Sequence, residues 1–406
     1  MLTIIKRKFF SALWRLKQAA IKSYQTTVQT LIEALTDRYW LLDLLPLFAK
    51  KKQGVLLVRL DLIGDFVLWL DAAQVYRQLY PQKKIVLAVN GLCAEVAATL
   101  TLWDEVIPVS VQKLRTDYLY RLRVLAKIRW RNFEVAIQPT FSREFVGDLL
   151  VRASNSPTRI GYSGDLHNIT DALKARSDVW YTKLIQNDVS STMELTANAH
   201  FVRELGLSSF LSNVPIIPKT HTLPSQFHYS EPYLVIAVGA SWKPRMWPIN
   251  YFADLMKQLR VEFSMPILLC GSQADYDLCL ELSQLANVNS VTNLAGQTTI
   301  LDLIEIIRQA DLVVSNDSSP THIAAATGAP VVSVVGGGHF GRFWPYETET
   351  KTSDERRSTA SYQMECFGCN WKCKFELSTN GAVPCISNVS VQGVLSLCKI
   401  VLRRHL

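Results

Sequence analysis

The chain has 406 residues, 49% of them hydrophobic, which is enough apolar material for more than one buried core. Its net charge of +8 is confined to one end, because residues 1–60 carry eleven Lys and Arg against three acidic residues, and the remaining 32 basic and 32 acidic residues balance. This neutral body argues against a protein that coats nucleic acid, and we expect no nucleic-acid partner.

Residues 1–53 alternate basic residues with Phe, Leu, Ile and Trp, a pattern that predicts a basic amphipathic helical extension. Such a helix could lie on an anionic membrane surface, or it could pack on the protein's own body. No apolar run reaches the roughly 20 residues that span a bilayer. Arg15 and Lys17 interrupt the first apolar stretch, which is not typical of a signal peptide. We expect a cytoplasmic protein, peripheral on the inner face of the cytoplasmic membrane if the helix docks there.

From Gly54 onward the pattern alternates between strands and helices. In the first part we expect strands at 54–60, 84–90, 105–109 and 133–139 and helices at 66–80 and 113–131. Strands that alternate with helices predict a parallel sheet of βαβ units. Residues 210–232 contain four prolines and no periodicity, which indicates an interdomain linker.

The alternation then resumes. We expect strands at 233–239, 266–271, 311–315 and 329–335 and helices at 250–261, 275–285, 299–309 and 320–327. The sequence therefore predicts an α/β protein with two Rossmann-like domains facing across a cleft. The predicted domains are an N-terminal Rossmann-like domain at 54–225, a C-terminal Rossmann-like domain at 226–390 that includes a Cys-rich loop at 366–385, and a C-terminal helix at 391–406.

A turn typical of phosphate binding follows the strand at 311–315. It reads Asn316-Asp317-Ser318-Ser319-Pro320 and leads into a helix of small residues. The free N–H groups and the positive dipole end of such a helix attract phosphate. Asp317, Ser318 or Ser319 can serve as the N-cap, and Pro320 suits the first helical turn. An ordinary capped βα turn explains the same pattern.

Two further groups of polar residues follow the first predicted strand of each domain. Asp65, after the strand at 54–60, could accept a proton in a site beyond the strand ends, or it could cap the helix at 66–80. The chain has no G-x-G-x-x-G at this place, which disfavours a nicotinamide-dependent enzyme. Ser241, Lys243 and Arg245, after the strand at 233–239, are donors suited to a diphosphate, although a solvated basic loop is the alternative.

These three segments together resemble the heptosyltransferase-like glycosyltransferases of the lipopolysaccharide core, glycosyltransferase family 9. The matching stretches are IGD at 63–65, GASWKPRMWP at 239–248 and SNDSSPTHIAAATGAPVVSVVG at 315–336, and the resemblance covers residues 54–390. It implies a GT-B fold in which 54–225 is the acceptor domain and 226–390 the nucleotide-sugar domain. The donor it implies is a nucleotide diphosphate sugar, ADP-heptose in the best-known members. It also implies transfer with inversion, without a catalytic metal, to a hydroxyl of a lipopolysaccharide core or related glycan.

The resemblance also implies roles for single residues. Asp65 falls on the catalytic base, and the positions that face the donor are Ser241 and Arg245 at the diphosphate, Asp275 at the ribose, Asp317, Ser318 and Ser319 in the phosphate turn, and His322 in the helix after it. The chain departs from the family pattern at three places. Ser318-Ser319 replaces Thr-Gly, residues 336–339 (Gly-Gly-Gly-His) replace Phe-Gly-Pro-Thr, and Asp61 replaces Ser or Thr and could compete with Asp65 as proton acceptor.

Four of the eight cysteines lie within twenty residues, at Cys366, Cys369, Cys373 and Cys385. In a reducing cytoplasm such a cluster indicates a metal site rather than disulfides. Four thiolates suit a structural Zn²⁺ or iron ion, and free thiols in a compact loop are the alternative. We expect the isolated Cys93, Cys270, Cys279 and Cys398 in the core.

The stretch 113–131 carries seven basic residues and could meet an anionic glycolipid or glycan acceptor, or it could be a solvated helix face. Other functions remain open on the sequence alone. They are a GT-B transferase that uses another nucleotide sugar on a different glycan or protein acceptor, a GT-B sugar-nucleotide epimerase or hydrolase, and a non-catalytic membrane-associated scaffold.

Overall fold

The computed structural model describes residues 53–186, 193–351 and 354–403. The predicted N-terminal amphipathic helix lies outside these residues. Among the helices that the structure describes, none has the length and apolar character needed to cross a membrane.

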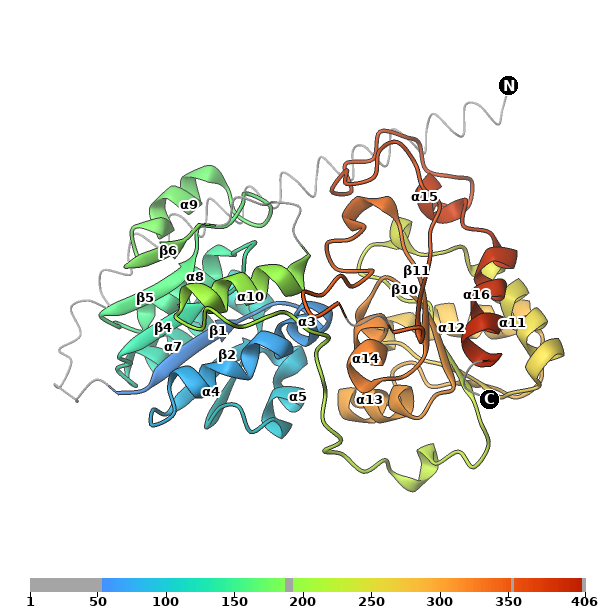
Figure 1. The fold of residues 1–406 in the computed structure, drawn as a ribbon, viewed down its shortest axis with the longest axis horizontal. Coiled ribbons are helices and arrows are strands. Elements are labelled where there is room, and N and C mark those ends of the chain that lie inside the picture. The colour runs from blue at the N-terminus through green and yellow to red at the C-terminus, as the bar shows by residue number, and fades with distance from the viewer. Residues whose placement is uncertain (1–52, 187–192, 352–353, 404–406) are drawn as a thin grey trace. The chain divides into compact units, whose positions relative to one another are not determined.

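The first sheet has six strands in the order β3-β2-β1-β4-β5-β6 (Figure 1). Its central strand β1 pairs in parallel with β4, with Val55 opposite Val135, and β4 pairs in parallel with β5. Every residue of β1 is buried, as expected for a parallel strand covered on both faces. The strands are β1 (Val55–Arg59), β2 (Ile85–Asn90), β3 (Glu105–Val109), β4 (Val135–Gln138), β5 (Thr158–Tyr162) and β6 (Lys183–Ile185).

Strands β5 and β6 were not predicted. The helices in this part of the chain cover both predicted ranges and add four that were not predicted, at 94–99, 145–153, 171–178 and 194–204. They are α3 (Ile63–Ala73), α4 (Val75–Leu79), α5 (Ala94–Thr99), α6 (Val111–Thr116), α7 (Tyr118–Arg129), α8 (Phe145–Ala153), α9 (Asp171–Asp178) and α10 (Glu194–Glu204). The predicted helix at 66–80 begins three residues earlier and is divided in two. The basic stretch at 113–131 is also two helices, because Asp117 accepts a hydrogen bond from Tyr120 N (2.9 Å) and starts α7 afresh.

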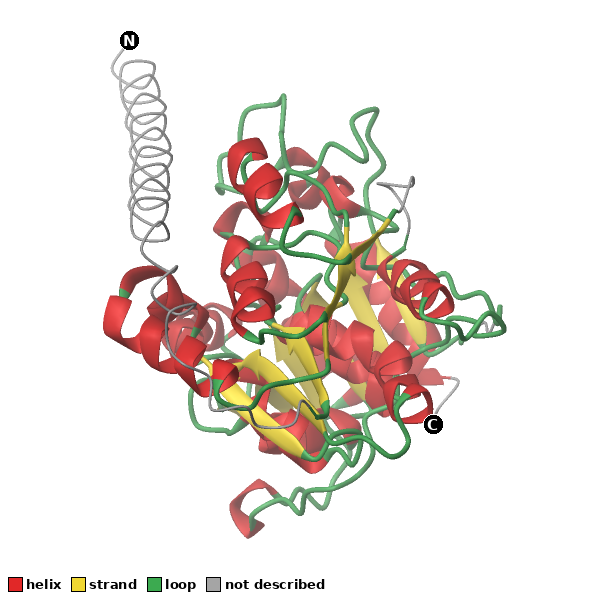
Figure 2. Ribbon diagram, turned by 90° about the vertical axis from the view of Figure 1, so that its left-hand side faces the viewer, coloured by secondary structure: helices red, strands yellow, loops and turns green. Residues whose placement is uncertain are grey.

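The second sheet is also parallel, with the order β12-β11-β10-β7-β8-β9. Figure 2 draws the strands in yellow and the helices that cover them in red. Its central pair is β10 with β7, with Val313 opposite Val235. The strands are β7 (Leu234–Ala237), β8 (Ile267–Leu269), β9 (Val291–Asn293), β10 (Leu312–Asn316), β11 (Val331–Val334) and β12 (Arg357–Ala360). The helices are α11 (Ile249–Phe263), α12 (Tyr276–Ala286), α13 (Ile300–Arg308), α14 (Ser319–Thr327), the short α15 (Pro384–Ser387) and α16 (Val391–Arg403). Two parallel α/β sheets confirm the predicted fold class.

The chain forms two compact units. The first unit comprises residues up to Leu60, Val86–Gly91 and Ile107–Leu184, and the second comprises Asp61–Ile85, Leu92–Val106 and Ile185–Leu406. The core of the second unit contains buried residues of β7, β8, β10 and β11 together with α11, α12 and α16. Helix α3, which carries Asp65, therefore belongs to the same unit as the second sheet and packs on α14 and α10.

Candidate active site

Asn316, the last residue of β10, fixes the loop that follows β7. Its side chain is fully buried, its Nδ2 donates to the carbonyl oxygen of Val238 (2.7 Å), and its Oδ1 accepts from the backbone N–H of Trp247 (2.9 Å). One side chain thus holds both ends of the 239–248 segment at the carboxyl edge of the second sheet. This is the edge where open α/β sheets bind ligands.

Arg245 reaches from that loop to the turn after β10. Its Nη2 donates to the carbonyl oxygen of Asp317 (3.2 Å) and to Asp317 Oδ2 (3.3 Å). Burial raises the pKa of Asp317, and the neighbouring Arg245 charge opposes that shift. The Nε of Arg245 is buried and has no hydrogen-bond partner in the part of the chain that the structure describes. A buried donor without a partner favours an acceptor group there, such as a phosphate oxygen.

The turn after β10 starts α14 as the sequence predicts. Ser318 is the N-cap residue, and Pro320 stands in the first turn. The Ser318 hydroxyl donates back to the carbonyl oxygen of Asn316 (3.3 Å) instead of capping the first turn. Thr321 Oγ1 donates to the same carbonyl oxygen (3.0 Å), which ties the helix start to the strand end. The N-terminal N–H groups and the helix dipole of α14 remain suited to an anion.

Helix α3 meets α14 through Gly64 and His322. Leu62 is the N-cap residue of α3, so Asp65 is the third residue of the helix and not its cap. A Cβ on Gly64 would lie 2.9 Å from His322 Cδ2, so only glycine fits without a shift. Asp65 is partly exposed beside this contact. The predicted base therefore lies in the helix that packs on α14, the helix after the phosphate turn.

His322 is held in the interior of the second unit. Its Nδ1 lies 2.9 Å from the Tyr346 hydroxyl, and the two rings stack with an interplanar angle of 18°. Burial, and to a lesser extent the charge of Arg245, lowers the pKa of His322 to about 4. The imidazole is therefore neutral at neutral pH.

Asp275 lies at the ends of two neighbouring strands. Its Oδ2 accepts from the backbone N–H (2.8 Å) and the hydroxyl (2.7 Å) of Ser272, which forms a capping box. Its side chain lies against Gly239 after β7 and Gly271 after β8: a Cβ on Gly239 would lie 2.7 Å from Asp275 Oδ1, and a Cβ on Gly271 would lie 2.8 Å from Asp275 Cβ. The two glycines make room for the carboxylate at the sheet edge.

The structure brings together several of the predicted donor residues, with Arg245, Asp317, Ser318 and Ser319 at one place and His322 one turn further along α14. Ser241 and Lys243 are exposed on the same loop as Arg245. The sequence analysis did not identify Trp371, whose ring lies 4.6 Å from the guanidinium carbon of Arg245. No local pattern could have found it, because the two residues are far apart in the sequence.

The four clustered cysteines lie near one another. Burial raises the pKa of the Cys369 and Cys385 thiols; Cys366 and Cys373 add to the rise at Cys369, and Cys366, Cys369 and Cys373 add to it at Cys385. All eight cysteines fall among the described residues and are free thiols. Within the described residues, no group of three or more His, Cys, Asp or Glu side chains has an arrangement that could hold a metal ion. The structure does not show the predicted metal site. As predicted, Cys93, Cys270, Cys279 and Cys398 are buried.

Two of the seven basic residues at 113–131 are buried and cannot face a partner. Arg121 donates to the carbonyl oxygens of Leu114 (2.5 Å) and Arg115 (2.8 Å), and so ties α7 to α6. Arg129 is also buried. The exposed cations of α7 are Arg123 and Lys127.

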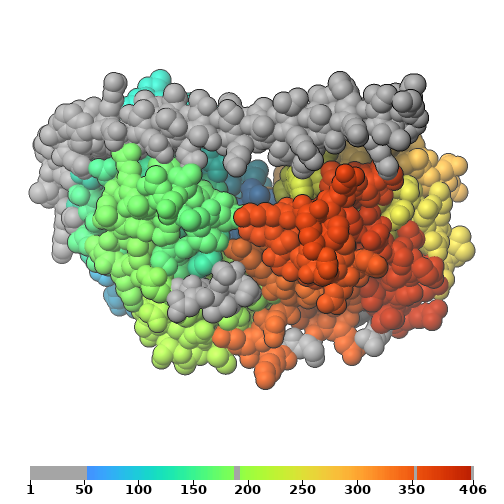
Figure 3. All heavy atoms as spheres, turned by 90° about the horizontal axis from the view of Figure 1, so that it is seen from above, coloured from blue at the N-terminus to red at the C-terminus, as the bar shows by residue number. Residues whose placement is uncertain are grey.

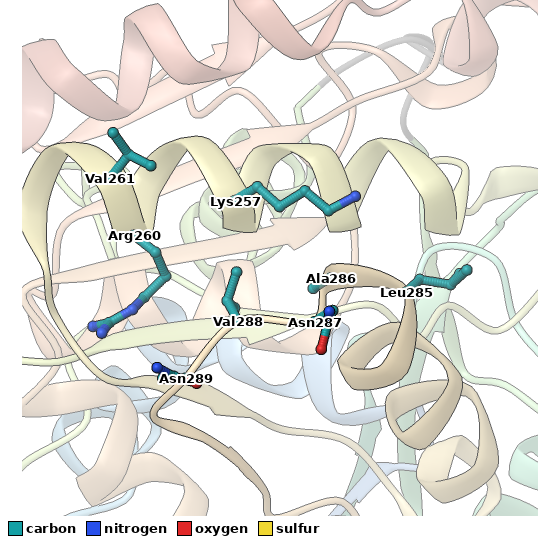
Figure 4. A pocket seen from close by; sticks show the side chains of 8 residues that line it. All are labelled: Lys257, Arg260, Val261, Leu285, Ala286, Asn287, Val288 and Asn289. Carbon is teal, nitrogen blue, oxygen red and sulfur yellow. The ribbon is translucent and has the colours of Figure 1, made fainter.

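A surface hollow of about 690 Å³ lies elsewhere in the second unit, between α11 and the turn after α12 (Figure 4). Its lining includes Lys257, Arg260 and Leu285 and none of the predicted site residues. The candidate site is therefore defined by its contacts and not by this hollow.

The model of glycosyltransferase family 9 (heptosyltransferase) matches residues 121–371, which is more than half of the chain. The chain belongs to glycosyltransferase family 9. It is 24% identical over 293 residues to lipopolysaccharide heptosyltransferase 2 of Salmonella typhimurium, covering 70% of this chain and 82% of that one. The predicted family and the predicted class of enzyme, a glycosyltransferase, are confirmed.

Solved structures show the same fold. The structure of E. coli ADP-heptose lipopolysaccharide heptosyltransferase II has a TM-score of 0.63 at 17% identity, covering 87% of this chain and 99% of that one. E. coli heptosyltransferase WaaC with ADP-2-deoxy-2-fluoro heptose has a TM-score of 0.59 at 15% identity, covering 87% and 100%. The predicted GT-B fold of this family 9 enzyme is confirmed.

Proposed function

We propose that this family 9 enzyme transfers heptose from ADP-heptose to a hydroxyl group of a lipopolysaccharide core or related glycan. The anion site formed by Arg245, Asp317 and the start of α14 carries the proposal. The curated relative is a lipopolysaccharide heptosyltransferase, and one solved neighbour holds an ADP-heptose analogue. Both support this choice of donor and acceptor.

In the proposed reaction the Asp65 carboxylate accepts the proton of the acceptor hydroxyl. The hydroxyl oxygen then forms a bond to the anomeric carbon from the face opposite the diphosphate, and the bond from that carbon to the phosphate oxygen breaks. The configuration at the anomeric carbon inverts, and ADP leaves with the electron pair. The proton, the bonds and the electron pair are thus all accounted for, without a metal or redox cofactor in the chemical step.

The negative charge that grows on the leaving diphosphate requires positive groups at fixed positions. Arg245, held by Asp317, would donate to the phosphate oxygens. Ser241 and Lys243 on the same loop, and Ser318 and Ser319 at the start of α14, would add hydrogen bonds and charge. Asp275, at the ends of β7 and β8, would accept a ribose hydroxyl, and His322 would support the turn from within α14.

We propose an anionic acceptor and a cytoplasmic location. The exposed Arg123 and Lys127 of α7 support recognition of a phosphorylated glycolipid, and eight free thiols suit a reducing compartment. Docking of residues 1–53 on the inner face of the cytoplasmic membrane is part of the same proposal, and that segment lies outside the described residues.

We further propose that Cys366, Cys369, Cys373 and Cys385 bind a structural Zn²⁺ or iron ion. The neighbouring thiols raise the pKa of Cys369 and Cys385, which supports this proposal, since thiolates so close repel unless a cation joins them. Metal analysis of purified protein should find about one Zn or Fe per chain, against none in Cys366→Ser/Cys369→Ser. A metal-free wild-type protein with four reactive thiols would overturn this assignment.

The test of the main proposal is a comparison of nucleotide sugars. Calorimetry should show that ADP-heptose binds more tightly than UDP- or GDP-sugars, and transfer should require a heptose-deficient lipopolysaccharide acceptor. Heptose release at the full rate without acceptor would indicate a hydrolase instead. Failure to bind any nucleotide diphosphate sugar would favour a non-catalytic role.

A further inference from the structure

We propose that Trp371, carried by the Cys-rich loop at 366–385, is a positioning residue that holds Arg245 at the donor diphosphate. The proposal rests on the proposed function, in which Arg245 binds the diphosphate. The guanidinium carbon of Arg245 lies 4.6 Å from the centre of the Trp371 ring. The Nη2 of the same guanidinium donates a hydrogen bond to Asp317. A cation over an indole face is attracted by the ring quadrupole, and indole is the strongest partner of this kind.

Trp371 is itself fixed by two further contacts. Its ring meets Trp242, from the same loop as Arg245, edge to face at 6.0 Å and 71°. Its Nε1 donates to His339 Nδ1 (3.1 Å). Because an indole nitrogen can only donate, His339 Nδ1 carries no proton in this contact, and its Nε2–H donates to Asn370 Oδ1. The orientation of the ring under the guanidinium is thus set at its edge and at its nitrogen.

The backbone that carries Trp371 has an unfavourable conformation. Asn370 and Trp371 have φ values of 51° and 59°, and the left-handed region is disfavoured for a bulky side chain. Two backbone hydrogen bonds maintain it, from Asn370 N to Gly338 O (3.0 Å) and from Gly368 N to Gly337 O (2.8 Å). Strain of this kind persists where the surrounding structure determines it, and it is concentrated at functional sites.

The glycine run at 336–338 explains how the loop can come so close. A Cβ on Gly336 would lie 2.8 Å from the Trp371 ring, and a Cβ on Gly337 or Gly338 would overlap the rings of Phe367 or Trp371. The glycines therefore let two aromatic rings of the Cys-rich loop lie directly on the backbone after β11. The Cys-rich loop forms part of the surface seen in Figure 3. Backbone hydrogen bonds join it to residues 336–339, and its Trp371 ring lies against Arg245. The glycine run, one of the places where this chain departs from the family pattern, thus lies against the ring that contacts Arg245.

The alternative is that Trp371 only packs against the core of the second unit. The two roles differ in what they change in folded protein. Loss of packing lowers the fraction of active enzyme and hence the apparent kcat, but leaves the donor KM and the Kd of ADP as they were. Loss of positioning weakens the hold on the diphosphate, so KM and Kd rise. Retaining an aromatic face at this position should then restore binding.

The experiment compares full-length wild type with Trp371→Leu, Trp371→Met, Trp371→Phe and the control Phe375→Leu. Phe375 is an exposed ring of the same loop, and it contacts Lys374 rather than Arg245. ADP binding by calorimetry and donor KM by initial rates are measured on each. Leu and Met should raise both constants about tenfold, which corresponds to about 1.4 kcal/mol. Phe should stay within about twofold of wild type, because it keeps the ring face.

The outcomes separate the two proposals. If wild type binds neither ADP nor ADP-heptose, the proposed function fails. If wild type binds them and Trp371→Leu and Trp371→Met keep the wild-type KM and Kd, or match Phe375→Leu, the positioning role is wrong. Should the Leu variant not fold, the Met and Phe variants still decide, since they differ from each other mainly in the aromatic face.

Discussion

Gly64→Ala tests the contact between the helix of the proposed base and the phosphate turn. The new Cβ would lie 2.9 Å from Cδ2 of His322, a ring that is buried and stacked on Tyr346 and so has little freedom to move. Overpacking of this kind costs about 1–3 kcal/mol. Replacing a helical glycine by alanine returns up to about 1 kcal/mol. We expect a net loss of about 1 kcal/mol, or a fall in Tm of about 2–4 °C.

The matched control is Gly393→Ala in α16. Gly393 is exposed, and the nearest atom to its Cβ would be Ser390 Oγ at 3.1 Å, so the helix gain should dominate and stability should rise slightly. Thermal unfolding of both variants, followed by circular dichroism, makes the comparison. A Gly64→Ala protein as stable as Gly393→Ala would refute the reasoning. Adding His322→Ala to Gly64→Ala should relieve the clash, which a double-mutant cycle detects as a coupling energy.

Three further outcomes follow from the site. Asp65→Asn should abolish transfer while the Kd of ADP, measured by calorimetry, stays near wild type; a rate near wild type would remove Asp65 from its role. Asp317→Ala should free Arg245 and raise the donor KM severalfold, whereas Asp254→Ala on α11, a matched change at an exposed carboxylate, should not. His322 has its pKa lowered to about 4 from 6.5, so the unfolded chain binds the proton more readily and stability falls as pH drops from about 6.5 toward 4. His322→Gln should flatten that part of a stability profile measured by denaturant titration, and an unchanged slope would contradict the assignment.

Local signals in the sequence were sufficient for the phosphate turn and for four of the six strands of the second sheet, whereas β9 and β12 were not predicted. The strand at β10, the N-cap at Ser318, Pro320 and the small residues of α14 all agree with one another, so local pattern and structure coincide. The start of α3 was predicted three residues late, because Gly64 and its neighbours read as a loop when their partner is unknown. Its partner, His322, lies in a distant helix that no periodicity reveals.

The remaining parts of the site depend on contacts between distant segments. Asn316 was visible in the quoted motif, but its bonds to Val238 and Trp247 require the two strand ends to be neighbours. The role of the glycines at 336–338 was also hidden. As a sequence they are a departure from a family pattern, and only the aromatic rings lying on them give the reason.

The membership of α3 in the second unit has a consequence for catalysis. The helix is attached there at both ends, by Gly64 against His322 near its start and by Asp71 near its end, where Oδ2 accepts from the backbone N–H of Asn213 (2.8 Å). Asp65 therefore belongs to the same compact body as Arg245 and α14. Under the proposed mechanism, the base and the groups that receive the leaving diphosphate keep their relative positions through the packing of α3 on α14. Gly64→Ala should for this reason lower kcat more than it raises the donor KM, since it displaces the base relative to a diphosphate site that Asn316 and Arg245 still hold. Equal effects on both constants would mean that the α3–α14 contact supports donor binding alone.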